Sequence, residues 1–340
     1  MYFKSKELKE FRKNNGLLID VRSPGEYYKG NMPNSINIPL FDNEERSSVG
    51  KKYKNNGNYK ALLLGLSIIE NKLDNLIEEL VNKILIYKEA NKTEQINIYC
   101  SRGGMRSKSI AWLINKLGFE AVILEGGYKS YRRWVLKTFE SKIKLIVIGG
   151  KTGTGKTRVL NLLNKSSFQV IDLEFLANHR GSTFGALGMK GQPTNEEFEN
   201  LIAEQLHTFN RNENIYVEAE SANIGKCRVP YDFFKQMQKA ERIEIIRSLN
   251  NRIEELVNTY SRYPQNDLKE AVLRIKKRLG PQRTKLALDS IDKKQWENVC
   301  KAVLEYYDKC YEFELEKIDD KRKIDLTDKK DLEVIKLIVR

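Results

Sequence analysis

Short apolar runs alternate with stretches of helical periodicity along the first part of the chain. Apolar residues three or four positions apart predict helices over about 68–90 and 107–117, and Gly118 ends the second of them. Short runs rich in apolar residues predict buried strands. These strands cover 17–21, 35–38, 96–99 and 121–124. We therefore expect residues 1–137 to form a small α/β domain.

The alternation continues beyond residue 143. An apolar strand over 144–148 is followed in turn by helices and further strands, which predicts a parallel, doubly wound sheet. The further strands cover 168–171, 215–218 and 242–246, and the helices cover about 158–163, 195–210, 231–239 and 249–260. After about residue 265 the pattern is mostly helical. With a polar connector over 136–142, we expect a second α/β domain with a helical C-terminal region over 143–340.

The composition of the chain predicts what kind of partner it binds and in which cellular compartment it works. The chain has 340 residues, enough for two cores, and a formal net charge of +14. Basic clusters at 129–137 and 274–285 favour a polyanion, with nucleic acid ahead of a membrane surface, although a lysine-rich solvated surface is the alternative. The cysteines form neither a metal-binding spacing nor a disulfide framework, and no apolar run is long enough to cross a membrane. We expect a cytoplasmic protein.

A complete phosphate-binding loop follows the strand over 144–148. The string Gly149-Gly-Lys-Thr-Gly-Thr-Gly-Lys-Thr157 fits the pattern G-x-x-x-x-G-K-[ST] and runs into a predicted helix, which is the setting that this motif requires. Its backbone N–H groups and the helix dipole favour phosphate. Lys156 is expected to neutralise a terminal phosphate and Thr157 to be able to hold Mg²⁺, although no metal site is firmly indicated. The expected phosphate-binding residues are Gly150, Thr152, Gly153, Thr154, Gly155, Lys156 and Thr157.

A second loop joins the strand over 96–99 to the helix over 107–117. It begins with Cys100, at a position where a helix N-terminus stabilises a thiolate. Such a thiolate is a catalytic nucleophile, and the backbone around it can hold a tetrahedral oxyanion. A buried, inert cysteine is the ordinary alternative, which the neighbouring glycine pair and arginines disfavour. The other residues expected to contribute to this site are Arg102, Gly103, Gly104, Met105, Arg106 and Ser107.

Polar residues also follow two strands of the second sheet. Ligands of open α/β sheets bind at the carboxyl ends of strands, so we expect these residues close to the phosphate loop. The carboxylates are candidates for ordering a phosphate-bound Mg²⁺, and the histidine, arginine and serine are candidate donors to a charged substrate. For each residue alone, a surface polar side chain is the alternative. The candidates are Asp172, His179, Arg180, Gly181 and Ser182 after one strand, and Glu218 and Glu220 after the other.

The first domain resembles the rhodanese fold. The resemblance is carried by Asp20-Val-Arg-Ser-Pro-Gly-Glu-Tyr27, Gly30-Asn-Met-Pro33 and Asn37-Ile-Pro39. In that family the loop cysteine carries a persulfide. Here Arg106 follows Cys100 by six positions, one more than in ordinary sulfurtransferases. This longer spacing resembles that of the related phosphatases and should admit a phosphate-sized group.

Taken together, the two domains resemble the tRNA 2-selenouridine synthase family over about residues 15–290. The combination of strings is more specific than either domain motif alone. The strings are Glu45-Arg-Ser-Ser-Val-Gly-Lys-Lys-Tyr-Lys54, the loop from Cys100 to Ser107, Gly126-Gly-Tyr-Lys-Ser-Tyr-Arg-Arg133, the phosphate loop, and residues 172–185.

The resemblance implies a transferase that modifies the wobble uridine, position 34, of tRNAs for Lys, Glu and Gln. Geranyl diphosphate would first alkylate the sulfur of 2-thiouridine, and selenium from selenophosphate would then replace the geranylthio group. The phosphate loop suits a diphosphate leaving group, and the Cys100 loop suits selenophosphate. No tightly bound cofactor is expected beyond these co-substrates and an optional Mg²⁺, and a selenophosphate-supplying enzyme is a candidate partner. Arg132 and Arg133 are the leading candidates for contacts with tRNA.

Three other hypotheses stay open. An ATP-dependent RNA kinase or sulfurtransferase would bind ATP in the phosphate loop and carry a persulfide on Cys100. A nucleotide-gated binding module would use an inactive rhodanese fold, which the intact Cys100 and both loop arginines disfavour. A phosphatase would use Cys100 and Arg106 to release phosphate from a generic aryl phosphate.

Overall fold

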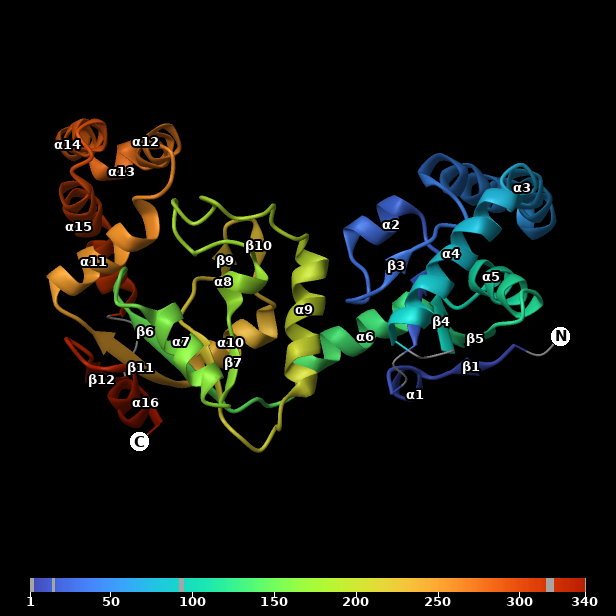
Figure 1. Ribbon diagram of the computed structural model, residues 1–340, viewed down its shortest axis with the longest axis horizontal. Helices are drawn as coiled ribbons and strands as arrows, with labels where there is room; N and C mark the ends of the chain where they lie inside the picture. The colour runs from blue at the N-terminus through green and yellow to red at the C-terminus, as the bar shows by residue number, and fades with distance from the viewer. Residues whose placement is uncertain (1–2, 14–15, 92–94, 316–320, 340) are drawn as a thin grey trace. The chain divides into compact units, whose positions relative to one another are not determined.

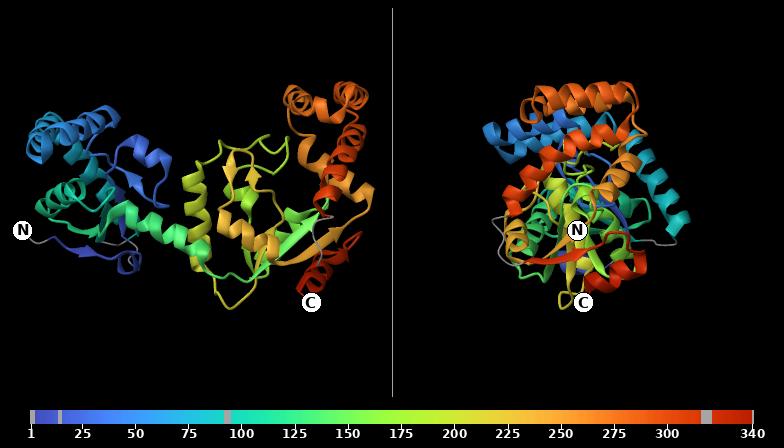
Figure 2. Two further views of the ribbon diagram at one scale, coloured as in Figure 1. Left: turned by 180° about the vertical axis from the view of Figure 1, so that it is seen from behind. Right: turned by 90° about the vertical axis from the view of Figure 1, so that its left-hand side faces the viewer.

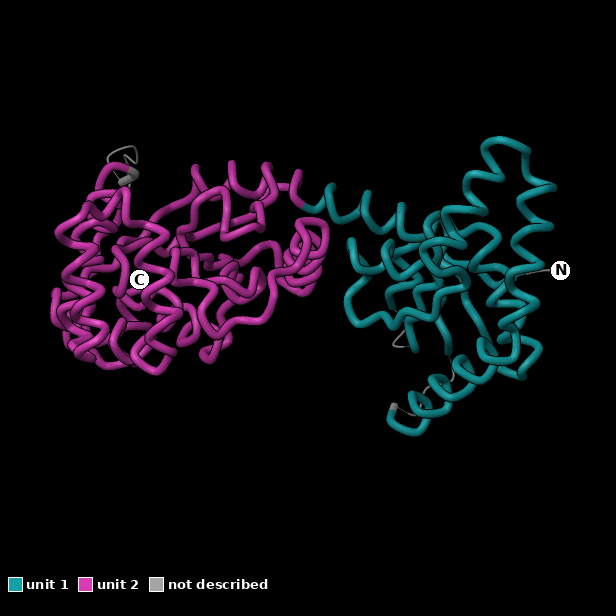
Figure 3. Tube along the Cα trace, turned by 90° about the horizontal axis from the view of Figure 1, so that it is seen from above, with its two compact units in different colours: residues 1–138 teal, residues 139–340 magenta. Residues whose placement is uncertain are grey.

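In the computed structural model the chain forms two compact units, residues 1–138 and 139–340 (Figures 1 and 3). The structure describes residues 3–13, 16–91, 95–315 and 321–339. Among these residues, no helix is both long and apolar enough to cross a membrane. Both units are built on parallel β-sheets with helices between the strands, which confirms the predicted α/β class.

Unit 1 contains a five-stranded parallel sheet with the order β1-β5-β4-β2-β3. The strands are β1 (Ser5–Lys6), β2 (Leu17–Asp20), β3 (Ile36–Asn37), β4 (Gln95–Tyr99) and β5 (Glu120–Leu124). The helices are α1 (Leu8–Phe11), α2 (Pro24–Lys29), α3 (Asn43–Glu70), α4 (Leu73–Asn91), α5 (Met105–Lys116) and α6 (Gly127–Glu140). Asp20 pairs with Tyr99, so the segments that follow β2 and β4 leave the sheet at the same edge.

The core of unit 1 fixes the position of α5. Apolar side chains of the strands pack with Leu80 and Ile84 of α4 and with Ile110 and Ile114 of α5. These helical positions recur at a spacing of four residues, so each helix turns one apolar stripe to the core. Because α5 is anchored in this way, its N-terminus is held at the loop that follows β4.

The helix expected over 68–90 is in fact divided between α3 and α4. Most of α3 was not predicted, because its buried residues are Ala61 and Gly65 and it has almost no apolar periodicity. Its start is fixed by a capping box instead. Asp42 accepts a hydrogen bond from the Glu45 N–H, and the Glu45 carboxylate accepts one from the Asp42 N–H.

Unit 2 contains a second five-stranded parallel sheet, with the order β12-β11-β6-β8-β7. Its strands are β6 (Leu145–Gly150), β7 (Gln169–Ile171), β8 (Ile215–Glu218), β11 (Glu241–Ile246) and β12 (Lys321–Asp325), and β9 (Asn223–Ile224) and β10 (Cys227–Arg228) form a separate hairpin. The helices are α7 (Lys156–Lys165), α8 (Leu173–Leu176), α9 (Asn195–Thr208), α10 (Tyr231–Lys239), α11 (Leu249–Tyr260), α12 (Gln265–Arg274), α13 (Lys276–Leu279), α14 (Pro281–Asp292), α15 (Trp296–Leu315) and α16 (Asp331–Val339).

Two apolar clusters stabilise unit 2. In the first, strand residues pack with Val159 and Leu163 of α7 and with Val334 and Ile338 of α16. In the second, α12 to α15 pack on one another around residues such as Val272, beside the sheet (Figures 1 and 2). The helical C-terminal region that the sequence predicts is therefore present up to α15.

The last part of the chain returns to the sheet, which sequence reasoning did not anticipate. Strand β12 pairs in parallel with β11 at the edge of the sheet, with Ile324 opposite Ile245. The strand reads Lys-Arg-Lys-Ile-Asp and therefore has no apolar run. Charged residues are common on edge strands because they discourage pairing with another chain.

Residues 136–142, expected as a polar connector, are helical up to Glu140 because α6 continues. Phe139 is buried and packs against Phe233, with 6.2 Å between the ring centroids. The side-chain amide of Gln236 donates to the carbonyl oxygens of Phe139 and Ser141. The division between the units thus falls within a helix whose end is packed and hydrogen-bonded in unit 2.

Candidate active sites

The loop of Cys100 lies between the end of β4 and the start of α5. Cys100 is only 3% exposed, and its Sγ lies 3.3 Å from the hydroxyl oxygen of Ser107. The Ser107 hydroxyl donates to the carbonyl oxygen of Gly104 at 3.0 Å. Since the hydroxyl has one proton, its oxygen is left to accept the thiol proton of Cys100. The first turn of α5, which begins at Met105, includes Ser107 and so lies next to this thiol.

Glycines of two loops support the backbone around Cys100. Gly103 and Gly127 have φ angles of 66° and 57°, a region that favours glycine. A Cβ on Gly127 would lie 2.3 Å from the Cys100 carbonyl oxygen, and one on Gly103 would lie 2.7 Å from the Leu124 carbonyl oxygen. The Tyr128 N–H also donates to the Cys100 carbonyl oxygen at 2.8 Å. The segments that follow β4 and β5 therefore contact each other closely only because both positions lack a side chain.

Arg106 is held by an ion pair with Glu26. Its guanidinium donates to the two carboxylate oxygens of Glu26 at 2.6 and 3.3 Å and to the Ser101 hydroxyl at 2.8 Å. Ser101 in turn donates to Glu26 at 2.8 Å. Burial alone would raise the pKa of Glu26, but hydrogen bonding to Arg106 and its charge lower that pKa to about 2. These contacts thus fix the position of the Arg106 guanidinium at one side of the loop.

The remaining loop residues lie on the open side of the loop. Arg102 and Met105 are exposed, and a Cβ on Gly104 would have no atom within 4 Å. The loop therefore combines a buried thiol, an exposed arginine and a helix N-terminus. Such an arrangement can bind a phosphate-sized anion next to the sulfur.

In unit 2, the phosphate loop connects β6 to α7. Gly153 and Gly155 have φ angles of 81° and 78°, as the sharp turns of such a loop require. The Lys156 Nζ lies over the loop, 3.0 Å from the Gly150 carbonyl oxygen. The Thr154 hydroxyl donates to a carbonyl oxygen within the loop, and its side chain is 2% exposed. This side chain therefore stabilises the loop from its buried side, away from the cleft.

The helical C-terminal region braces the phosphate loop. Arg252 of α11 donates through its Nε to the Thr152 carbonyl oxygen at 2.8 Å and forms an ion pair with Asp308 of α15. The N–H of Gly150 donates to the Tyr311 hydroxyl oxygen at 2.6 Å. Two helices distant in sequence therefore contribute to the geometry of the loop.

A cleft of about 1100 Å³ brings the phosphate loop together with residues from the neighbouring strand ends. Of the predicted loop residues, Gly150, Thr152, Gly153, Gly155, Lys156 and Thr157 line it. Of the second region, Asp172, Arg180, Gly181, Ser182 and Glu220 line it. The expectation that these strand ends meet at the phosphate loop therefore agrees with the geometry.

Three carboxylates form the acidic part of this region. Glu174, Glu218 and Glu220 each place an oxygen within 4.8 Å of the others. Glu218 is fully buried, and its Oε1 accepts the Glu174 N–H at 2.7 Å, while its Oε2 has no hydrogen-bond partner among the residues that the structure describes. Glu174 also accepts the Thr157 hydroxyl at 3.2 Å. Oxygen ligands of this kind suit Mg²⁺, which would satisfy the unpartnered oxygen.

Burial raises the pKa values of the carboxyl groups in this cluster. Burial raises the pKa of Glu218 well above its usual value, and repulsion from the neighbouring carboxylates adds to the effect. Burial also raises the pKa of Glu174 to about 7, although the charge of Lys156 opposes it. The cluster therefore holds protons near neutral pH that a divalent cation would displace.

Arg180 and Gly181 are positioned by specific contacts. Arg180 donates to the Leu187 carbonyl oxygen at 2.8 Å and to the Tyr263 hydroxyl at 3.2 Å. Gly181 has a φ of 62°, and a Cβ there would lie 2.7 Å from Glu220 Oε2. A side chain at this position would push against the carboxylate cluster.

His179 is not among the side chains that line the cleft. It is 9% exposed, and a Cβ on Gly225 would lie 2.8 Å from its Cδ2 atom. Burial lowers its pKa, so the imidazole is neutral at pH 7. His179 therefore packs against the segment between β9 and β10, and its donation to a charged substrate stays a prediction.

Arg132 and Arg133 lie on α6. Arg133 is exposed and Arg132 is half-buried, while Tyr131 and Val135 on the same helix are fully buried. The apolar side of α6 is thus anchored in unit 1, and Arg133 is presented to solvent. Contact of these arginines with RNA stays a prediction.

Sequence reasoning did not select several residues that shape the two sites. Glu26 stands within the string 20–27 and Glu174 within 172–185, so both had a local signal. Arg252 and Tyr311 stand in helices of the C-terminal region. Their roles depend on contacts between distant segments and have no local signal.

The folds and sites define the class of the protein as a rhodanese-like domain joined to a P-loop domain with a carboxylate cluster, a class suited to group transfer. Residues 4–133 match the Rhodanese-like domain, and residues 143–338 match the tRNA 2-selenouridine synthase AAA domain. The tRNA 2-selenouridine synthase of Sulfurovum sp. (strain NBC37-1) is 34% identical over 338 residues, covering 89% of this chain and 90% of that protein. The enzyme of the same name from Shewanella frigidimarina (strain NCIMB 400) is 32% identical over 340 residues, with coverage of 89% and 90%. The chain belongs to the tRNA 2-selenouridine synthase family of tRNA-modifying transferases.

Proposed function

We propose that this chain converts 2-thiouridine at wobble position 34 of tRNAs for Lys, Glu and Gln into 2-selenouridine in two steps, in the cytoplasm. The observation that carries the proposal is the presence, in one chain, of a phosphate loop with an adjacent carboxylate cluster and of a cysteine loop that holds an exposed arginine at a helix N-terminus. Each step is assigned to one of these two sites.

The first step is alkylation of the nucleobase by geranyl diphosphate. The sulfur at C2 of the base forms a bond to C1 of the geranyl group, the C1–O bond breaks, and pyrophosphate leaves with the electron pair. The base loses its N3 proton to solvent. Lys156 and the N–H groups of the phosphate loop stabilise the charge that develops on the leaving diphosphate.

A magnesium ion fits the carboxylate side of this cleft. Thr157, Glu174, Glu218 and Glu220 would hold it, and the unpartnered oxygen of Glu218 is the observation that supports the fit. When bound, the ion supplies positive charge for the diphosphate. The chain's own part is to orient the diphosphate through the phosphate loop.

The second step is replacement of sulfur by selenium from selenophosphate. Selenium bonds to C2 of the base and the C2–S bond breaks, so that geranylthiolate leaves and takes up a proton. Hydrolysis of the Se–P bond then releases phosphate. We place selenophosphate at the Cys100 loop, where Arg102 and the N-terminus of α5 face the phosphate, and where the Cys100 thiol lies beside the selenium and donates the proton that geranylthiolate takes up. An enzyme that makes selenophosphate is the corresponding partner.

Mass spectrometry of nucleosides tests the proposal. Purified protein is incubated with tRNA that contains 2-thiouridine, first with geranyl diphosphate alone and then with selenophosphate added. We expect S-geranyl-2-thiouridine in the first reaction and 2-selenouridine in the second. Nucleoside products that require ATP, with no geranylated intermediate, would contradict the proposal in favour of an RNA kinase or a sulfurtransferase.

A further inference from the structure

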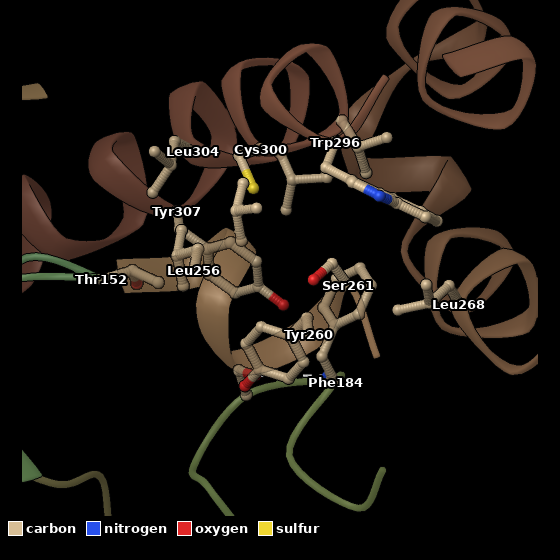
Figure 4. Close-up of a pocket in the computed structure, with 14 residues that line it drawn as sticks. Thr152, Phe184, Leu256, Tyr260, Ser261, Leu268, Trp296, Cys300, Leu304 and Tyr307 are labelled. Carbon is tan, nitrogen blue, oxygen red and sulfur yellow. Dashed lines mark hydrogen bonds between the residues drawn. The ribbon is translucent and has the colours of Figure 1, made fainter. Parts of the chain in front are cut away.

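A second, apolar pocket lies beside the phosphate cleft of unit 2. Figure 4 shows side chains of α15 facing side chains of α11 across it, with Phe184 below. The cavity volume of this pocket is about 60 Å³, so the pocket is a narrow slot.

One face of α15 forms a wall of the slot. Its lining residues are Trp296, Val299, Cys300, Val303, Leu304 and Tyr307. They are separated by three and four positions along the helix, which places them on a single stripe. That stripe also contributes to the second apolar cluster of unit 2, yet it does not close on α11 completely.

The slot and the phosphate cleft are continuous. Thr152 of the phosphate loop, Ser182, Leu256, Tyr260 and Tyr307 line both of them. In the view of Figure 4, Thr152 stands at one end of the slot, and Trp296 and Leu268 stand at the other. A ligand whose phosphate lies in the loop can therefore extend an attached chain into the slot.

The slot offers no charged group to a ligand. Burial raises the pKa of Cys300 to about 11, so this thiol is neutral. Burial also raises the pKa of Tyr260 to about 12, and its hydroxyl forms a hydrogen bond with Ser182. The Tyr307 hydroxyl accepts the N–H of Thr183 at 3.3 Å. The polar atoms are neutral and partly satisfied, so the slot presents chiefly hydrocarbon and ring surfaces.

We propose that this slot binds the isoprenoid chain of an allylic diphosphate while the phosphate loop holds its diphosphate, and that Trp296 limits the length of the chain. The inference rests on the proposed function, since it locates the geranyl group of that reaction. It also gives the helical C-terminal region a role: α11 and α15 brace the phosphate loop and form the walls around the hydrocarbon chain.

Calorimetric binding experiments without tRNA test the location. Wild type is titrated with geranyl diphosphate and with pyrophosphate. A buried methylene is worth about fourfold in affinity, so we expect geranyl diphosphate to bind on the order of 10²-fold more tightly and with a more negative heat-capacity change. Cys300→Phe fills the slot and should reduce the ratio of the two affinities to within about tenfold, with pyrophosphate binding unchanged. The matched control Lys301→Phe, on the exposed side of α15, should keep the wild-type ratio.

A gain of binding tests the role of Trp296. Trp296→Leu keeps an apolar side chain and opens the far end of the slot. We expect the affinity for farnesyl diphosphate, which has five more carbons in its chain, to rise at least fivefold relative to geranyl diphosphate. A destabilised variant would lose both ligands, so a change in their ratio reports on the slot itself.

The possible outcomes distinguish failure of the proposed function from failure of the slot as the binding site of the isoprenoid chain. If wild type binds geranyl diphosphate no better than pyrophosphate and forms no geranylated nucleoside, the proposed function is wrong. If wild type prefers geranyl diphosphate and Cys300→Phe keeps that preference, the slot is a packing gap only and the chain binds elsewhere. An unchanged farnesyl-to-geranyl ratio in Trp296→Leu overturns the role of Trp296.

Discussion

Glu174 is the residue whose ionisation most directly links the phosphate cleft to pH. It is a carboxyl group beside the hydroxyl of Thr157, and burial raises its pKa to about 7. Below pH 7 this carboxyl is mostly protonated, and a proton has to leave before a cation can bind. Above pH 7 the carboxylate is available without that cost.

We therefore expect the affinity for Mg²⁺ to increase with pH. For one group with a pKa of about 7, the apparent dissociation constant should fall about tenfold between pH 6 and pH 8. Measurement of the unfolding midpoint against Mg²⁺ concentration at the two pH values gives this change. Glu174→Gln should bind Mg²⁺ more weakly and lose the part of the pH dependence that Glu174 supplies, while Glu218, whose pKa burial also raises, keeps its own part. Equal dissociation constants for wild type at pH 6 and pH 8 would show that Glu174 is not a ligand.

Lys156 is expected to act on the leaving diphosphate. Lys156→Ala removes the ammonium group while the apolar core of α7, formed by residues such as Val159 and Leu163, is untouched. Loss of such an electrostatic stabiliser typically costs about 10²–10³ in rate. Initial rates of geranylation measure the effect, with the exposed Lys239→Ala as control. Normal geranylation by Lys156→Ala would mean that the loop binds another phosphate, ATP first of all.

At the scale of single residues, the sequence predicted those whose roles depend on a contiguous motif. Lys156, Thr157 and Cys100 stand in strand–loop–helix settings that fix their surroundings locally. The partner of Arg106 was not predictable in the same way, because Glu26 reaches it from another element. His179 does not line the cleft, and a histidine in a polar string gives no local sign of such a buried position.

At the scale of elements, the loops after β4 and β5 depend on each other. Gly127→Ala would place a Cβ 2.3 Å from the Cys100 carbonyl oxygen at a φ of 57°. We expect a loss of about 2 kcal/mol or more in the free energy of unfolding of unit 1, measured by denaturant titration, because both strain and overlap act there. Gly104→Ala is the matched control, since its Cβ would have no neighbour within 4 Å. Equal stability of the two variants would contradict this interpretation of the glycine pair.

The elements that the sequence predicted share a simple property. Buried strands such as β4 and β6 are short apolar runs, and α5 and α7 have a regular apolar stripe. Helix α3 and strand β12 lack such patterns: α3 is stabilised by its capping box, and β12 by pairing with β11. Elements of that kind are specified by caps and tertiary contacts, which hydrophobic periodicity does not record.

At the scale of the whole molecule, the net charge of +14 favours association with tRNA through its phosphates. We expect log affinity against log salt to have a slope of several units. Arg132→Glu/Arg133→Glu should weaken binding to tRNAs broadly and reduce the slope by about one to two units, without changing which base is modified. Filter-binding titrations measure both quantities.

The charge-matched control for this double variant is Lys51→Glu/Lys52→Glu, in which both exposed lysines stand on α3. It changes the net charge by the same amount at a different place. If the two double variants lose affinity equally, net charge alone is responsible. If the arginine variant keeps the affinity and the slope of wild type, Arg132 and Arg133 merely solvate the surface.

The central claim is that the two chemical steps are divided between the two units. Cys100→Ala removes the thiol of unit 1 and leaves the phosphate loop of unit 2 intact, so it tests this division directly. The measurement is mass spectrometry of nucleosides from tRNA incubated with geranyl diphosphate and selenophosphate, with the exposed Ser109→Ala on α5 as control. We predict that Cys100→Ala accumulates S-geranyl-2-thiouridine and forms no 2-selenouridine, while the control forms 2-selenouridine as wild type does. Loss of both products in a folded Cys100→Ala variant, or normal formation of 2-selenouridine, would contradict the account.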